Sequence, residues 1–187
     1  MFIQTEETPN PATLKFLPGQ NILENGTVDF SSSISAEKSP LAKRLFTVTG
    51  VARVFFSGDF VSVTKAGDTD WSMLKPMILA VLMEHLSTGQ PILNDDYFKK
   101  TDTAQTEDEP EIVGQIKELL EERVRPMVAM DGGDIVFDRF EDGIVYLEMQ
   151  GACSGCPSST ATLKSGIENM LKHYIPEVIE VRPTSEY

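Results

Sequence analysis

Hydrophobic and polar positions alternate along three segments of the N-terminal half, as in β-strands that bury one face. Residues 13–17 alternate directly after Pro9-Asn10-Pro11, a sequence typical of a turn. Residues 51–56 and 60–64 also show strand patterns, and Ser57-Gly58-Asp59 separates them. Two apolar segments joined by such a short glycine-containing connection predict a β-hairpin.

Helical spacing of apolar residues occurs twice in the same half. Ser39 can cap a short helix that has Pro40 at its first position and ends near Phe46. Pro76 either starts a second, longer helix or kinks it. The residues whose helical spacing predicts this helix are Trp71, Leu74, Ile78, Val81, Leu82 and His85. Strands and amphipathic helices together predict a small α+β domain.

The C-terminal half begins with another helical pattern, and Pro126 is expected to end or bend that helix. Its apolar stripe consists of Ile112, Ile116, Leu119, Leu120 and Val124. Residues 135–140 and 144–149 flank Glu141-Asp142-Gly143 and predict a second hairpin.

A last helix and a last strand complete this half. The helix is predicted by Leu163, Ile167, Met170, Leu171 and Tyr174. Residues 178–181 can add a final strand. The order α-β-β-α-β predicts a three-stranded sheet backed by two helices.

The chain is therefore predicted to be α+β, with two small α+β domains at residues 1–98 and 110–187. Residues 99–109 are polar and end in an acidic run. Such a segment cannot bury enough apolar surface to offset the entropy lost on ordering, so it is predicted to be a flexible linker. The charge changes here too: residues 1–103 carry 12 acidic and 9 basic side chains, and residues 104–187 carry 17 and 7.

Composition limits the partners and compartments of the chain. Its 187 residues have a formal net charge of −13, whereas phosphate binding needs clustered Lys and Arg, so no nucleic-acid partner is expected. The longest apolar stretch is shorter than a membrane span, so no membrane partner is expected either. The start, Met1-Phe2-Ile3-Gln4-Thr5-Glu6-Glu7, lacks the basic region of a secretory signal and is acidic for a transit peptide. We expect a bacterial cytoplasmic protein, with a mature mitochondrial matrix protein as the alternative.

Several prominent residues are predicted to have structural roles. Gly132 and Gly133 can take positive φ in a turn, and Asp131 and Asp134 beside them are predicted to cap that turn rather than form a catalytic carboxylate pair. Burial is expected for the aromatic residues Phe55, Phe56 and Trp71. The methionines are predicted to fill the cores, including Met73, Met77, Met83, Met127 and Met130. For Met127 and Met130 the alternative is that they line the cysteine loop.

Both cysteines of the chain lie in Cys153-Ser154-Gly155-Cys156, which Pro157 follows. On the predicted elements they fall between the end of a strand and the start of a helix. Amide donors and the helix dipole at such a place favour the thiolate, the form that binds metals. The glycines, serine and proline around them predict an exposed loop.

Two thiolates supply half of a four-thiolate metal or cluster site, and neither His85 nor His173 is an obvious completing ligand. Two chains related by two-fold symmetry would complete the shell. Three alternatives remain open from the residues alone: a thioredoxin-like dithiol–disulfide oxidoreductase, a structural zinc site, and two cysteines buried in a core. The oxidoreductase would need a βαβ lead-in, for which the predicted C-terminal domain has no room.

Two parts of the sequence resemble known domains. Residues 109–181, with Met130-Asp131-Gly132-Gly133-Asp134 and the segment from Gly151 to Ser159 around both cysteines, closely resemble the NifU-like C-terminal domain. The start of the chain, residues 1–5 and 8–16, resembles the N-terminal domain of Nfu-type proteins.

The resemblance implies an iron–sulfur cluster carrier or late-acting scaffold, and not an enzyme. Members of this family hold a [4Fe-4S] cluster between two protomers of a homodimer. They take part in cluster assembly between an upstream scaffold and the apo iron–sulfur proteins that receive the cluster. By resemblance, Cys153 and Cys156 are the cluster and metal ligands, and no catalytic residue is implied. The N-terminal domain is assigned to partner contacts or structure.

Overall fold

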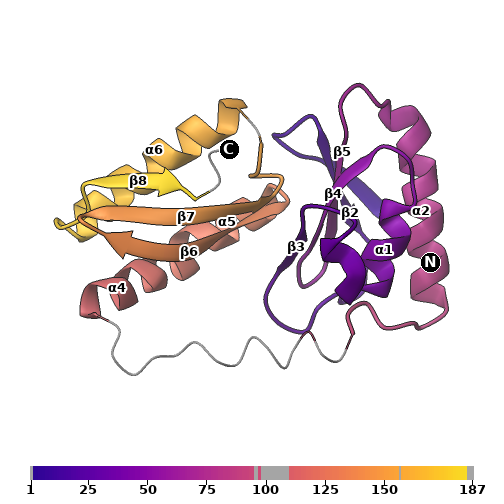
Figure 1. The fold of residues 1–187 in the computed structure, drawn as a ribbon, viewed down its shortest axis with the longest axis horizontal. Coiled ribbons are helices and arrows are strands. Elements are labelled where there is room, and N and C mark those ends of the chain that lie inside the picture. The colour runs from indigo at the N-terminus through magenta and orange to yellow at the C-terminus, as the bar shows by residue number, and fades with distance from the viewer. Residues whose placement is uncertain (1, 95–96, 98–109, 156, 185–187) are drawn as a thin grey trace. The chain divides into compact units, whose positions relative to one another are not determined.

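The computed structural model describes residues 2–94, 97, 110–155 and 157–184, with the backbone alone at residues 157–160. The chain divides into two compact units, Met1–Ala104 and Gln105–Tyr187 (Figure 1). Each unit combines a sheet with helices, which confirms the predicted α+β class. The predicted linker at residues 99–109 lies outside the described residues, so the exact domain limits stay a prediction.

The first unit is built on an antiparallel sheet of five strands in the order β1-β2-β5-β4-β3. Its strands are β1 (Gln4–Glu7), β2 (Thr13–Leu17), β3 (Val28–Phe30), β4 (Val51–Phe56) and β5 (Val61–Lys65). Its helices are the short 3-10 helix η1 (Ser35–Lys38), α1 (Pro40–Phe46) and α2 (Trp71–Ser87). The predicted β4–β5 hairpin and both α-helices are confirmed, whereas β1, β3 and η1 were not predicted.

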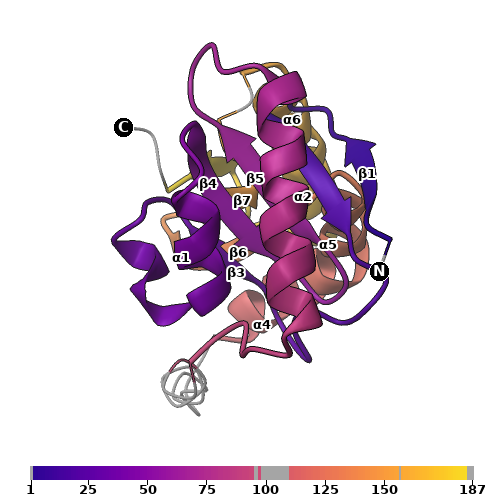
Figure 2. The ribbon, with the colours of Figure 1, turned by 90° about the vertical axis from the view of Figure 1, so that its right-hand side faces the viewer.

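Helices α1 and α2 lie on the same face of this sheet (Figure 2). The start of α1 is fixed as predicted: Ser39 Oγ accepts a hydrogen bond from the Ala42 amide at 3.0 Å and donates one to the Ile92 carbonyl at 2.5 Å. Phe55 and Phe56 are both fully buried, as predicted, and Trp71 is half-buried. Phe56 packs edge-to-face on Phe30 with ring centroids 5.5 Å apart.

Helix α2 is apolar on two sides, and this explains a wrong prediction. Leu74, Ile78 and Leu82 face the core at helical spacing. Met73, Met77 and Met83 were predicted to fill the core, but they are exposed, with Met73 at 69%. Three branched residues already fill the inner face of the helix, so the unbranched methionines between them point outward.

His85, near the end of α2, is completely buried. Its Nε2 lies 3.2 Å from the Pro91 carbonyl oxygen, which can only accept, so Nε2 carries the proton. Its Nδ1 is buried without a hydrogen-bond partner in the described part of the chain. Protonating Nδ1 would leave a buried donor unpaired, and burial accordingly lowers the pKa of His85 below 6.5.

This environment predicts a loss of stability in mild acid. The unfolded chain takes up a proton at His85 as the pH falls through about 6.5, whereas the folded chain does so only at lower pH. Stability should therefore fall below pH ~6.5, by at most about 1.4 kcal/mol per pH unit. Urea unfolding at several pH values measures how the free energy of unfolding changes with pH. In the His85→Gln protein, the part of that change that comes from His85 should be absent.

The second unit has the predicted order α-β-β-α-β. Its elements are α4 (Glu111–Leu119), the π-helical turn η2 (Leu120–Val124), α5 (Arg125–Met130), β6 (Gly133–Glu141), β7 (Ile144–Gly151), α6 (Pro157–Tyr174) and β8 (Glu180–Pro183). The sheet order is β6-β7-β8, with β7 antiparallel to β6 and parallel to β8. Ile116 and Val124 from the first helical segment and Leu171 from α6 join Leu147 of β7 in one core. The three-stranded sheet backed by helices is confirmed.

Pro126 does not end the helix, because the chain stays helical to Met130. Proline has no N–H for the i→i−4 ladder, and its ring would clash with the carbonyl four residues earlier. The π turn η2, directly before α5, is wider than an α-helical turn and so accommodates both the missing N–H and the proline ring. The helix therefore reaches almost to the start of β6, and the turn predicted at Gly132 and Gly133 occupies Asp131 and Gly132 instead.

None of the helices in the described part of the chain combines the length and apolar character that a membrane crossing requires.

Candidate metal centre

The cysteine loop follows β7 and precedes α6, as predicted. Gly151 ends β7 with a left-handed φ of 60°, a conformation that glycine adopts without strain. Two overlapping turns then reverse the chain: the Cys153 amide donates to the Gln150 carbonyl at 3.3 Å, and the Ser154 amide donates to the Gly151 carbonyl at 3.1 Å. These turns carry Cys153 back over the end of its own hairpin.

The turn between α5 and β6 lies directly against this loop. Gly132, with φ of 81°, accepts a hydrogen bond from the Ala152 amide at 3.2 Å. Gly133 stands opposite Gly151 in the β6–β7 register. The two glycine-containing motifs of the C-terminal half, twenty residues apart in sequence, thus form one structure around Cys153.

At Gly133 the start of β6 comes very close to the cysteine loop. A Cβ atom on this residue would lie 2.6 Å from Cys153 Sγ, 2.7 Å from the Gln150 carbonyl oxygen and 2.9 Å from the Cys153 amide nitrogen. Gly133 does not have positive φ, so the sequence-based reason for a glycine here was wrong. The residue leaves room for the cysteine and its loop rather than allowing a special backbone conformation.

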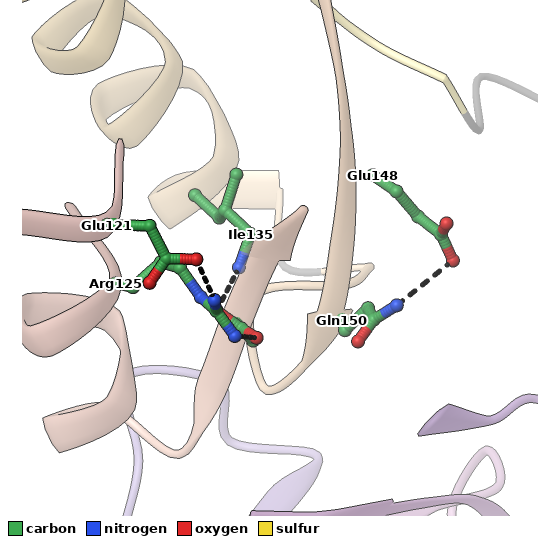
Figure 3. Close-up of polar contacts among 6 residues, drawn as sticks. Glu121, Arg125, Ile135, Glu148 and Gln150 are labelled. Atoms are coloured by element: carbon green, nitrogen blue, oxygen red, sulfur yellow. Dashed lines mark hydrogen bonds and ion pairs between the residues drawn. The ribbon is translucent and has the colours of Figure 1, made fainter. Parts of the chain in front are cut away.

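Asp134, next to Gly133, is buried and forms an ion pair with the partly exposed Arg125 at the start of α5, which Figure 3 labels beside Glu121 and Ile135. Arg125 donates from Nε to Asp134 Oδ1 at 2.9 Å and from a terminal nitrogen to Oδ2 at 2.7 Å, the bidentate geometry of a strong pair. The Ile135 amide adds a third hydrogen bond at 2.8 Å, and Arg125 also contacts Glu121. Hydrogen bonding to Asp134 raises the pKa of Arg125 above its ordinary value. The turn prediction for Asp134 missed this partner.

Burial of Cys153 also differs from the sequence prediction. Its side chain is 6% exposed and belongs to the hydrophobic core of the second unit, whereas an exposed loop was expected. The flanking residues do form turns, but these turns point the sulfur inward over Gly133. Cys156, the second predicted ligand, lies outside the described residues. Met127 and Met130 were predicted to be core residues, but both are exposed, Met130 at 72%.

The donor atoms near the loop limit what it can bind. Within the described residues no three His, Cys, Asp or Glu side chains are grouped so as to hold a metal ion. Asp134 is already bound to Arg125, and His173 lies at the far end of α6. Cysteine sulfur is a soft ligand of the kind that iron–sulfur clusters use, and the two cysteines of one chain still give half of a four-thiolate shell.

Two family models match the chain. "Scaffold protein Nfu/NifU N terminal" matches residues 3–89, and "NifU-like domain" matches residues 116–182. Among solved structures, a NifU-like protein from Saccharomyces cerevisiae covers 51% of this chain at 24% identity with a TM-score of 0.46, a likeness too weak to support any conclusion.

Curated relatives match nearly the whole chain. NifU-like protein 5, mitochondrial, from Arabidopsis thaliana is 58% identical over 181 residues, which are 95% of this chain and 66% of that protein. The human NFU1 iron-sulfur cluster scaffold homolog, mitochondrial, is 50% identical over 179 residues, 95% of this chain and 70% of that protein. The chain thus spans about two thirds of the length of these relatives.

The relatives correct one expectation and identify the family. A bacterial cytoplasmic protein was expected, but relatives at 50–58% identity are named as mitochondrial proteins, so that expectation is wrong. Nothing in the comparisons supports the thioredoxin-like alternative, and in the second unit an antiparallel hairpin, not a βαβ unit, precedes the cysteine loop. By both domains and by its relatives, this chain belongs to the Nfu/NifU family of iron–sulfur cluster scaffold proteins.

Proposed function

We propose that this protein carries a [4Fe-4S] cluster between two copies of itself and transfers it to apo iron–sulfur proteins. Cys153 and Cys156 of each copy are the proposed ligands. The observation that carries this proposal is the ligand count: a chain of a cluster-scaffold family with two cysteines, one of them in the loop before α6, needs a second chain to complete four thiolates.

The proposed role is delivery and not catalysis. A cluster held at a subunit boundary by two short loops has few protein contacts, which favours release to an acceptor. An upstream assembly scaffold would supply the cluster. Names of the relatives support a mitochondrial place of action for this chain as well.

Anaerobic reconstitution tests the proposal on the full chain. With iron, sulfide and a thiol reductant, the protein should turn brown, bind about four iron and four sulfide ions per two chains, and change from a smaller species to a dimer on a sizing column. Transfer is tested by adding an apo acceptor and following its activity. A colourless protein that binds no iron with both thiols reduced contradicts the proposal. Zinc in place of iron would support a structural site.

A fragment that lacks residues 1–103 should still bind the cluster. The loop, its supporting turn and the core around Cys153 all belong to the second unit. We expect the fragment to unfold cooperatively in urea and to bind iron with the stoichiometry of the full chain. A folded fragment that binds no iron, beside a full chain that does, would mean that the first unit contributes to the site.

A further inference from the structure

We propose that Gly133 is a positioning residue for Cys153: its missing side chain provides the space in which the cysteine loop and its sulfur are seated. This deepens the proposed function and rests on it where cluster binding is concerned. Gly133 lies twenty residues from Cys153 and has no ligand atom of its own. Its role is to fix where a ligand lies.

Close approach is the physical basis of this role. Of the three atoms that a Cβ at this position would meet, the nearest is the sulfur itself at 2.6 Å. The other two, at 2.7 and 2.9 Å, are backbone atoms of the turn that presents it. Real Cβ atoms essentially never come within 3.0 Å of such atoms. A flexible side chain could move aside, but the backbone of a hydrogen-bonded turn cannot do so without displacing Cys153.

Conformational preference does not explain this glycine. Its neighbours Gly132 and Gly151 have positive φ, and any other residue there would be strained for that reason. Gly133 has strand geometry and pairs with Gly151, so alanine is compatible with its backbone. An alanine at Gly133 therefore tests contact with the cysteine loop with little contribution from backbone strain.

Gly133 cannot easily retreat from the loop, because its strand is anchored next to it. The Arg125–Asp134 pair ties the first residues of β6 to the start of α5, and the Ala152–Gly132 hydrogen bond ties them to the loop. When a methyl group is added at Gly133, the less anchored partner is the loop. Displacement of Cys153 toward solvent is the expected response.

The first test needs no iron. In full-length Cys156→Ala protein Cys153 is the remaining thiol, and its alkylation rate by iodoacetamide, relative to the same protein in denaturant, reports how exposed it is. Gly133→Ala should raise this rate several-fold. Gly114→Ala is the matched control, because the same methyl group there meets no atom within 4 Å. Equal rates in the Gly133→Ala and Gly114→Ala proteins overturn the proposal.

A second measurement tests the proposal even if Gly133→Ala lowers the stability of the fold. The destabilisation caused by Gly133→Ala is measured by urea unfolding in the presence of Cys153 and in Cys153→Ala protein, a double-mutant cycle. Removing the sulfur removes the nearest contact, so the cost should be smaller in the second background. If Gly133→Ala lowers the free energy of unfolding equally with and without the Cys153 sulfur, the proposed contact between position 133 and that sulfur is wrong.

The third test uses the cluster in chains with both cysteines. After reconstitution, Gly133→Ala should lose its thiolate-to-iron absorbance to a chelator several-fold faster than wild type. Val181→Ala, buried in β8 away from the loop, lowers stability without touching the site and should keep the wild-type lifetime. A wild-type lifetime in Gly133→Ala overturns the proposal while the proposed function stands. A wild type that takes up no iron, with alkylation still faster in Gly133→Ala, rejects the function and keeps the positioning role.

Discussion

Replacing Cys153 by alanine should abolish cluster binding and also weaken the second unit. A cluster shared by two chains loses two of its four thiolates when each copy loses one, and the remaining pair cannot hold four iron ions. The expected readout is loss of the brown colour and near-zero iron per dimer after reconstitution. Cys156→Ala should lose the cluster in the same way.

The effect on folding distinguishes Cys153 from an exposed ligand. Because its side chain is 6% exposed and packs in the core of the second unit, removing the sulfur should cost about 1 kcal/mol of unfolding free energy. Urea unfolding of the apo protein measures this cost. Ser165→Ala is the control: it alters an exposed residue of α6, removes no thiol, and should keep both the cluster and the stability. A Cys153→Ala protein with the full iron content of wild type would remove Cys153 from the ligand set.

The sequence predicted those elements whose signals are local. Alternation on both sides of Ser57-Gly58-Asp59 and of Glu141-Asp142-Gly143 gave both hairpins, because turn chemistry and strand period act over a few residues. Ser39 and Pro40 gave the start of α1 for the same reason. In contrast, β1 has no fully buried residue and β3 has three residues in all, so neither shows a usable alternation. Both exist because neighbouring strands offer them hydrogen bonds.

Burial was predicted less well than secondary structure, because it depends on what surrounds a residue. The glycines and serine around Cys153 do form turns, but its sulfur lies against Gly133, twenty residues earlier in the sequence, and no local pattern indicates this contact. Residue type misled at Met73 and Met77, since the inner face of α2 was already filled. The position of Cys153 in a strand-to-helix loop was predicted because motif and element pattern agree there.

The Arg125–Asp134 pair had no local signal. The partners are nine positions apart, beyond the i,i+4 spacing at which side chains on one helix meet. They come together because the helix continues past Pro126 almost to the start of β6. Asp134 between Gly133 and a strand has the composition of a turn residue, and the sequence supports no more than that. A cation and a carboxylate on either side of a Gly-Gly turn could have suggested a pair, but not its burial.

Replacing Asp134 by alanine should therefore be among the most destabilising single changes in the second unit. The Asp134 side chain is 4% exposed and that of Arg125 27%, and the carboxylate accepts three hydrogen bonds. Removing one member of a buried pair leaves the other partly uncompensated, at about 3–5 kcal/mol. Because Arg125 is partly exposed and keeps Glu121, we expect about 2–4 kcal/mol.

An exposed ion pair on the same strand provides the control for Asp134→Ala. Asp138 and Arg139, on the same strand, form an ion pair with side chains 40% and 46% exposed. Asp138→Ala should cost less than about 1 kcal/mol, because water already solvates both partners. Urea unfolding compares the two variants in one background. Equal losses of unfolding free energy in the two variants would show that the Arg125–Asp134 pair adds little to stability. In that case, backbone pairing with β7 alone would hold β6 against the cysteine loop. A larger loss of unfolding free energy in Asp134→Ala than in Asp138→Ala, together with faster cluster loss in Asp134→Ala, would show that the Arg125–Asp134 pair also holds Cys153 in position.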